Sequence, residues 1–134
     1  AQYERLMHHL KTKRPEILKD RAARLRLAEV KLDLKMVHAL TLTNADIIAH
    51  GATPTMQASM VKFSSSELRY RMNSIAMDLL GRSGALSKES GDIAPEGGVF
   101  DQTYRSSPIL RFGGGTNEVQ RNIIAQRGLG LPRG

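Results

Sequence analysis

Two long stretches with helical spacing of apolar residues constrain the fold of this chain more than any other feature. The first runs from Glu16 to about His50 and the second from about Thr55 to Leu80. Apolar residues in the first stretch follow the i, i+3, i+7, i+10 pattern of one helix face: Leu27, Val30, Leu34 and Val37. At 1.5 Å per residue this helix would be roughly 50 Å long, a length typical of helical bundles.

Both predicted helices have broad apolar stripes and clear ends. In the first helix, a further set of apolar residues is expected to widen the stripe: Leu25, Ala28, Leu32 and Ala39. The second helix has its own stripe: Val61, Leu68, Met72, Ile75 and Leu79. Gly51 is predicted to end the first helix, Thr53 to cap the second with Pro54 in its first turn, and Gly81 to end it.

The remainder of the chain predicts shorter helices and one long loop. Residues 2–12 read as the end of a helix, 100–110 as a short helix and 116–129 as the last helix, while the glycine-rich residues 81–98 read as a loop. Because no alternating strand pattern is present, we predict an all-α antiparallel bundle of two long and two or three short helices. We expect residues 1–134 to form one helical domain of a longer protein.

Composition narrows the classes of partner and site. The absence of cysteine excludes disulfides and thiolate metal sites, and the formal net charge of +7 favours an anionic ligand or a solvated basic face. Three Tyr, three Phe and no Trp provide little aromatic surface for nucleic acid, although a basic nucleic-acid-binding module stays an alternative. We expect no metal site, no membrane span and a cytoplasmic location.

A run of three glycines followed by a helix start is the most informative local motif. Gly113 to Gly115 leave a loop without side chains, and Thr116 is predicted to cap the following helix. Bare main-chain N–H groups at such a bend can contact a flat or anionic ligand. The run lacks the Lys-Ser/Thr ending of a phosphate loop. A simple turn between helices is the alternative interpretation.

Other reactive residue types favour structural roles. The serine run at residues 64–66 has no nucleophile-elbow turn and more often marks a face of small residues where helices approach closely. The methionines on the second long helix could line an acyl pocket, but core filling is the commoner role. His8 and His9 are adjacent and point in different directions on a helix, which does not favour a shared metal ion.

Several segments resemble the C-terminal helical domain of the acyl-CoA dehydrogenases, a family of flavoenzymes. The strongest is Gly115 to Arg127, GTNEVQRNIIAQR, which resembles the family's last helix, and the tail to Pro132 continues the likeness. Arg24 to Glu29 resembles the start of the family's first long C-terminal helix. Pro54 to Phe63 resembles the proline-led start of its next helix, where a Lys usually follows. The resemblance covers roughly residues 15–134.

The resemblance implies a cofactor, a substrate and residue roles. Thr116, Asn117 and Glu118 would contact FAD, and Gly114 and Gly115 would meet the thioester of an acyl-CoA substrate. The implied reaction is α,β-desaturation: a carboxylate removes the α-proton and the β-hydrogen passes as hydride to the flavin. An electron-transfer flavoprotein would then accept the electrons. Family members also associate through this domain, so a homo-oligomer or a heteromer with a related subunit is expected.

The chain departs from the family pattern in three places. Many members carry the catalytic Glu where this chain has Gly114, so no catalytic residue is assigned here. The corresponding helix position that supplies the base in other members would precede residue 1, and Glu4 is judged too close to the next helix to replace it. The flavin-contacting Gln-x-x-Gly-Gly segment becomes a weaker set of candidates: Asp78, Leu79, Leu80, Gly81 and Arg82. The family's Arg-x-x-Phe-Gly segment is also missing.

Two interpretations of these departures stay open. The parent protein is either a divergent enzyme whose base lies outside this chain, or a non-catalytic structural subunit that pairs with a competent one. The isolated fragment is expected to be inactive in both cases.

Overall fold

The computed structural model describes residues 2–133, and these residues form helices and turns without a β-strand. The long helices are α2, Arg21–Ala49, and α3, Thr55–Leu80. The shorter α-helices are α1 (Gln2–Lys13), α4 (Val99–Ser106) and α5 (Asn117–Ile123). The predicted all-α bundle of two long helices and three short ones is therefore confirmed.

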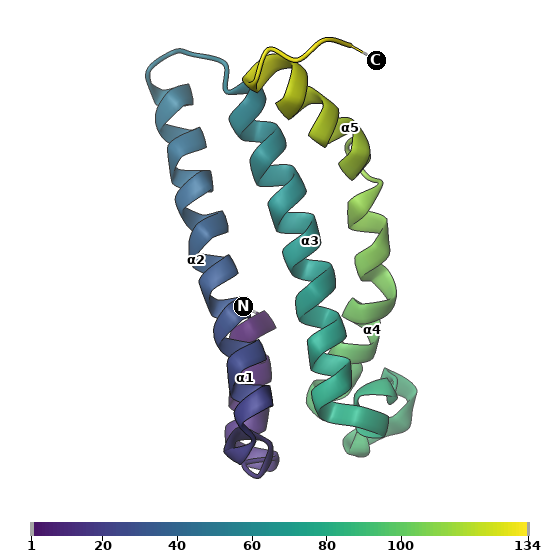
Figure 1. Cartoon of the computed structure of the whole chain (residues 1–134). Helices are drawn as coiled ribbons and strands as arrows, with labels where there is room; N and C mark the ends of the chain where they lie inside the picture. Colours follow the sequence, from purple (N-terminus) through teal and green to yellow (C-terminus); the bar gives the residue numbers. More distant parts are fainter. Residues whose placement is uncertain (1, 134) are drawn as a thin grey trace.

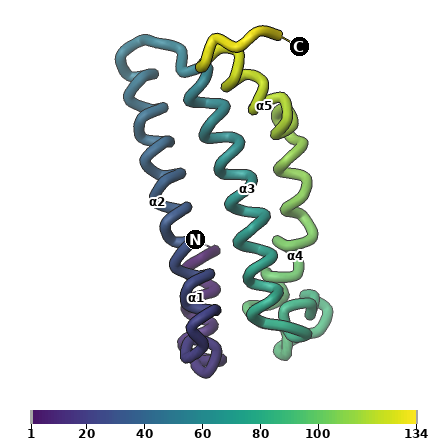
Figure 2. The backbone as a smooth tube through the Cα atoms, viewed as in Figure 1, coloured from purple at the N-terminus to yellow at the C-terminus, as the bar shows by residue number. Residues whose placement is uncertain are grey.

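The helices lie side by side in an elongated bundle. Helices α2 and α3 run antiparallel, α1 lies beside the first half of α2, and α4 and α5 follow one another along the other side of α3 (Figure 1). Figure 2 shows the turn between α2 and α3 at the end of the bundle where the C-terminal residues also lie. Helix α3 is thus the central element of the bundle, with α2 on one side and α4 and α5 on the other.

The ends of the long helices follow local chemistry, with two corrections. Gly51 and Gly81 have φ of +79° and +57° and end the helices as predicted. The continuous helix expected from residue 16 is wrong: a 3₁₀ turn at Ile17–Lys19 comes first. Asp20 then caps α2, because its extended backbone lets the carboxylate accept hydrogen bonds from the N–H groups of Ala22 (3.3 Å) and Ala23 (2.9 Å).

The second correction concerns the start of α3. Thr53 provides no capping hydroxyl, and Pro54 occupies the cap position rather than the first turn. The Thr55 N–H instead donates to the Thr53 carbonyl over 2.9 Å, so the main chain satisfies the first of the N–H groups that this helix start leaves without an intrahelical partner.

The segment at residues 81–98 is more ordered than the predicted loop. It contains three short 3₁₀ turns: η2 (Gly81–Ala85), η3 (Lys88–Ile93) and η4 (Pro95–Gly98). Gly98 lies so close to the main chain of Ser87 and Lys88 that a Cβ would overlap the Lys88 nitrogen. This close approach requires glycine and folds the segment back on itself.

The hydrophobic core lies where α1, α2, α3 and α4 meet. Phe100 is 2% exposed, and Leu6 and Leu10 on α1 are also fully buried. The buried core residues of the long helices are Leu27, Val30, Leu68, Met72, Ile75, Ala76 and Leu80. Leu34 and Val37 pack against this cluster, so the predicted main stripe of α2 is confirmed.

The expected widening of the α2 stripe is wrong. Leu25 and Leu32 are 54% and 68% exposed, and Ala28 and Ala39 are exposed as well. At 100° per residue, these positions project on the side of α2 opposite Val30 and Leu34. Helix α2 therefore has two apolar faces, and within residues 2–133 only the inner one is covered.

The last helix changes geometry before its end. Thr116 caps α5 as predicted, accepting a hydrogen bond from the Val119 N–H over 3.3 Å. After Ile123 the chain widens into a π-helical turn, Ile124–Gly128, instead of continuing as an α-helix to Leu129. A Cβ on Gly128 would overlap the Met56 sulfur, so glycine lets this end of the chain lie against the start of α3.

Candidate functional site

The glycine loop, defined as residues 112–116, lies on the surface between the 3₁₀ turn η5 (Ser107–Arg111) and α5. Gly113, Gly114 and Gly115 are exposed, and the latter two have φ of +69° and +88°. A Cβ on Gly114 would meet nothing within 4 Å, whereas one on Gly115 would lie 2.8 Å from Gln120 Nε2. The outward side of Gly114 is therefore open space.

Two hydrogen bonds fix the main chain of the loop. The Gly113 N–H donates to the Ile109 carbonyl over 2.9 Å, and Gln120 Nε2 donates to the Gly114 carbonyl over 3.2 Å. In a trans peptide the C=O and N–H groups point in opposite directions, so the Gly115 N–H faces away from Gln120. Within residues 2–133, the Gly114 N–H donates no hydrogen bond, and the Gly115 N–H, which closes the turn at residues 112–114, points back toward the carbonyls before the loop without forming a hydrogen bond of good geometry.

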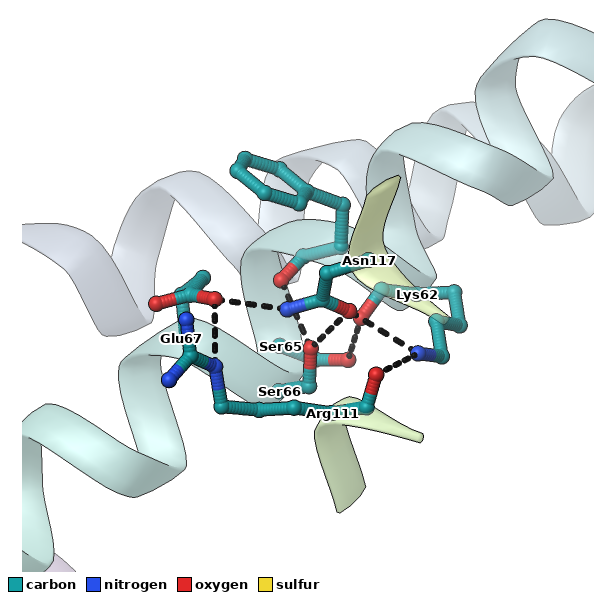
Figure 3. A network of polar contacts seen from close by, with 7 residues as sticks. Lys62, Ser65, Ser66, Glu67, Arg111 and Asn117 are labelled. Carbon is teal, nitrogen blue, oxygen red and sulfur yellow. Dashed lines mark hydrogen bonds and ion pairs between the residues drawn. The ribbon is translucent and has the colours of Figure 1, made fainter. Parts of the chain in front are cut away.

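Asn117 connects the loop to α3 through a buried side chain. The residue is 1% exposed, and its Oδ1 accepts hydrogen bonds of 2.9 Å from both Lys62 Nζ and Ser66 Oγ (Figure 3). Its Nδ2 donates to Glu67 Oε1 over 2.6 Å. These contacts occupy the Asn117 side chain, and because the whole residue is only 1% exposed, a ligand at the loop meets its neighbours instead.

The same α3 side chains reach the other end of the loop. Glu67 Oε1 also accepts a 2.9 Å hydrogen bond from Arg111 Nε, and Lys62 Nζ lies 3.4 Å from the Arg111 carbonyl oxygen (Figure 3). The Arg111 guanidinium lies 5.1 Å from the centre of the Tyr70 ring, a cation–π contact. Lys62 and Glu67 thus contact residues on both sides of the glycine loop.

Thr116 and Glu118 lie at the solvent side of the α5 start. Glu118 is exposed, and hydrogen bonds from its own N–H and from the Thr116 hydroxyl hold its pKa below that of an unperturbed glutamate. Both residues therefore remain polar and accessible beside the glycines. Their predicted contact with FAD stays a prediction.

Two adjoining depressions lead away from the loop along α3. The smaller, ≈ 210 Å³, is lined in part by Gly113, Leu110 and Lys62. The larger, ≈ 470 Å³, lies between α1, α2 and α3, and its apolar lining residues are Tyr3, Leu34, Val37, Leu68 and Met72. Ser65 and Arg69 line both depressions, so the small depression beside the glycine loop neighbours the larger, mostly apolar one.

The weaker flavin candidates at residues 78–82 lie elsewhere. Asp78 to Leu80 end α3 and Gly81 with Arg82 begin η2. At 1.5 Å per residue, Asp78 is about 17 Å along the helix axis from Glu67. Asp78 forms an ion pair with Arg26, and the Leu80 side chain is buried in the core. The two candidate sets could contact one FAD only at different parts of the molecule or from two subunits.

The early carboxylate and the histidines have other partners. Glu4 is exposed on α1, and its hydrogen bond from Lys31 Nζ (3.0 Å) lowers its pKa. His9 is buried against the Phe100 ring and lies 3.5 Å from Glu96.

Among residues 2–133 no group of three His, Cys, Asp or Glu side chains is arranged to hold a metal ion. No helix in that range is long and apolar enough to cross a membrane.

The polar network around Asn117 was missed by sequence reasoning. The serine run was interpreted only as a close-approach face, and Lys62 only as part of a motif. A usable signal was present: Lys62 and Ser66 stand four residues apart and therefore share one face of α3. Nothing local indicated that Gln120 would turn back to the Gly114 carbonyl.

The sequence of this chain is similar to sequences of known proteins. The sequence model of the family described as "Acyl-CoA dehydrogenase, C-terminal domain" matches residues 2–129. Acyl-CoA dehydrogenase FadE26 of Mycobacterium tuberculosis is 37% identical over 114 residues, which cover 78% of this chain and 28% of the relative. Acyl-CoA dehydrogenase IpdE1 of Mycolicibacterium smegmatis is 32% identical over 121 residues, covering 90% of this chain and 28% of the relative. The chain thus spans less than a third of the length of these curated relatives.

Solved structures share the fold. The ChsE4-ChsE5 complex from Mycobacterium tuberculosis aligns with a TM-score of 0.79 and 30% identity, over 88% of this chain and 30% of that one. The structure described as Tcur3481-Tcur3483 steroid ACAD aligns with a TM-score of 0.90 and 24% identity, over 99% of this chain and 34% of that one. Both descriptions name two proteins.

Proposed function

The chain belongs to the acyl-CoA dehydrogenase family through its C-terminal helical domain, and on that premise we propose that it forms the flavin- and thioester-facing part of such an enzyme. In this proposal the complete protein desaturates an acyl-CoA thioester at the α,β positions. The observation that carries the proposal is the exposed glycine main chain, which adjoins a small depression next to a larger, mostly apolar one. A planar ring and a thioester need open main chain, and an acyl group needs apolar cover.

The residues at the loop fit FAD. Gly114 has open space where a Cβ would stand, and within residues 2–133 its N–H donates no hydrogen bond. Thr116 and Glu118, which flank the buried Asn117, would contact the flavin, and Gly114 with Gly115 would contact the thioester. When bound, FAD supplies the oxidising power by accepting hydride from the β-carbon. This chain supplies the main-chain seat and orients the thioester beside it.

The catalytic base is proposed to come from outside this chain. Gly114 has no side chain to accept a proton, and the Glu4 carboxylate is engaged by Lys31 on α2. The α-proton would therefore pass to a carboxylate on an upstream helix or on a related subunit. If neither provides one, this chain is the non-catalytic structural subunit of a heteromer.

A partner subunit is supported by the outer face of α2. Leu25, Leu32 and Met36 are about half exposed or more and lie on one side of the helix. Contiguous apolar surface of this kind marks protein contacts more often than free surface. Heteromeric relatives such as the ChsE4-ChsE5 complex make a related subunit the proposed partner. An electron-transfer flavoprotein would then reoxidise the flavin.

Flavin retention and reduction test the proposal. The natural protein that contains this chain, purified alone and together with a related subunit, should retain FAD and show flavin absorbance. Adding saturated acyl-CoA thioesters without oxygen should bleach that absorbance if the assembled enzyme is catalytic. Retained FAD without bleaching would favour the structural-subunit alternative. Protein that stays colourless after incubation with FAD, alone and with its partner, would refute the proposal.

A further inference from the structure

We propose that Asn117 is a positioning residue, whose buried side chain clamps the glycine loop onto α3 and so sets where the loop main chain stands for its ligands. The proposal rests on the proposed function for the identity of those ligands. It assigns the Asn117 side chain to loop geometry, leaving ligand contact to the main chain and to neighbouring residues.

The hydrogen-bonding partners of Asn117 fix one orientation of its amide. Lys62 Nζ donates to Oδ1, whereas the Glu67 carboxylate can only accept from Nδ2. The Ser66 hydroxyl has one hydrogen, which it shares between Oδ1 and the Phe63 carbonyl, each 2.9 Å away. Rotating the amide by 180° would place its NH₂ group against the Lys62 ammonium and its oxygen against the carboxylate. A buried side chain between two donors and one acceptor thus has a single satisfied position.

We call Asn117 and its partners Lys62, Ser66 and Glu67 the clamp. Two of these side chains contact residues at both ends of the glycine loop. Lys62 and Glu67 contact Asn117 directly after the loop, and they also contact Arg111 directly before it. Both residues stand on α3, which is anchored in the core through Leu68 and Met72. The loop is therefore a short bridge between two points held by one helix, which limits how far its glycines can move while these part-buried contacts persist.

Exchanging the amide of Asn117 with the carboxylate of Glu67 distinguishes a positioning role of Asn117 from direct contact between its side chain and the ligand. Asn117→Asp places a second carboxylate against Glu67, and Glu67→Gln removes the carboxylate that holds Asn117 and Arg111. The double variant Asn117→Asp/Glu67→Gln restores one carboxylate and one amide and keeps the net charge of the cluster. In it, the new carboxylate at position 117 would accept from Lys62 and Ser66. Because Glu67 uses the single atom Oε1 for both Asn117 and Arg111, the new amide at position 67 must rotate so that its nitrogen donates to that carboxylate and its oxygen accepts from Arg111.

The chain offers a matched control for this swap. Asn122 stands on the same helix as Asn117 but is exposed. Asn122→Asp therefore makes the same chemical change on the same helix, but at an exposed position that has no contact with Lys62, Ser66 or Glu67.

Two measurements on the natural protein show whether Asn117 and its partners hold the glycine loop in place. The first is the rate of trypsin cleavage at the Arg111–Phe112 bond under native conditions, which reports on the loop without any ligand. The second is the Kd for FAD, together with the shape of the bound flavin spectrum. Both are made well below the melting temperature of each variant, with circular dichroism confirming the fold.

The single variants should be cleaved at least 10-fold faster at Arg111 and should bind FAD at least 10-fold more weakly. The double variant should return within 3-fold of the unaltered protein in both measurements, and Asn122→Asp should match it throughout. If Asn117→Asp does not fold, Ser66→Ala, which removes one of the two donors, should give an intermediate cleavage rate.

Two results would overturn the positioning role. Unchanged cleavage at Arg111 in the single variants would show that the loop does not depend on the clamp. A double variant with restored cleavage but weak FAD binding and an altered flavin spectrum would show that the Asn117 amide contacts the flavin itself. If the unaltered protein binds no FAD, the proposed function fails, and the cleavage series alone then decides whether Asn117 clamps the loop.

Discussion

Replacing each of two neighbouring glycines by alanine tests the geometry of the loop. Gly114 and Gly115 both have positive φ, so an alanine at either position is strained by about 1–2 kcal/mol, partly offset by about 0.4–1 kcal/mol from the stiffer unfolded chain. Only at Gly115 would the new Cβ also meet a side chain, Gln120 Nε2 at 2.8 Å. Moving that side chain breaks its hydrogen bond to the Gly114 carbonyl, which is worth about 1 kcal/mol.

The free energy of unfolding should therefore fall by about 1 kcal/mol in Gly114→Ala and about 2 kcal/mol in Gly115→Ala. With a urea m-value of about 2 kcal/mol/M, these losses correspond to midpoint shifts of about 0.5 M and about 1 M. Urea unfolding followed by circular dichroism measures both shifts.

A double-mutant cycle with Gln120→Ala identifies the cause of the difference. Without the Gln120 amide there is no clash, so Gly115→Ala should cost about 1 kcal/mol less in that background. The reasoning is refuted if the two glycine variants are equally stable, or if the effects of Gly115→Ala and Gln120→Ala simply add.

Other predictions concern the core, a carboxylate and the outer face. Phe100→Ala should lower the free energy of unfolding by about 3–5 kcal/mol, because this ring is buried where α1, α3 and α4 meet; a loss under about 1 kcal/mol in urea unfolding would contradict that placement. The Glu118 pKa is lowered on folding, so its stabilising contribution is complete above the pKa of the unfolded chain and is lost as the pH falls through the lower folded value. Carboxyl-carbon NMR should show a lowered Glu118 pKa that rises in Thr116→Val, and a pKa already at the ordinary glutamate value would argue against the hydrogen bonds. Leu32→Lys should weaken self-association or subunit pairing in light scattering without changing the melting temperature, and an unchanged molar mass would exclude the outer α2 face as the contact.

Sequence periodicity predicted the long elements well, because their signals are local. The bounds of α3 and the positive φ of Gly51 and Gly81 follow from apolar spacing and helix-ending glycines. The break before α2 was missed because a helical pattern alone does not show that Asp20 will leave the helix and cap the next one. Such a cap depends on the extended backbone of Asp20, which the spacing of apolar residues does not indicate.

The candidate site was predictable only in part. The glycines and the Thr116 cap could be located from the sequence, since each requires nothing beyond its neighbours. The Asn117 side chain could not be placed, because its partners Lys62, Ser66 and Glu67 stand far earlier in the chain and meet it only after α5 packs on α3. The two apolar faces of α2 likewise look the same in sequence, and only packing decides that Val30 is buried and Leu32 exposed.

Hydrogen exchange of the natural protein with and without FAD tests the central claim most directly. The claim is that bare main chain at the glycine loop contacts the flavin and the thioester. Amide exchange measured by mass spectrometry should slow on FAD binding in peptides that cover residues 112–118, and slow further when a thioester ligand is added. FAD binding that leaves the exchange of residues 112–118 unchanged would contradict the account.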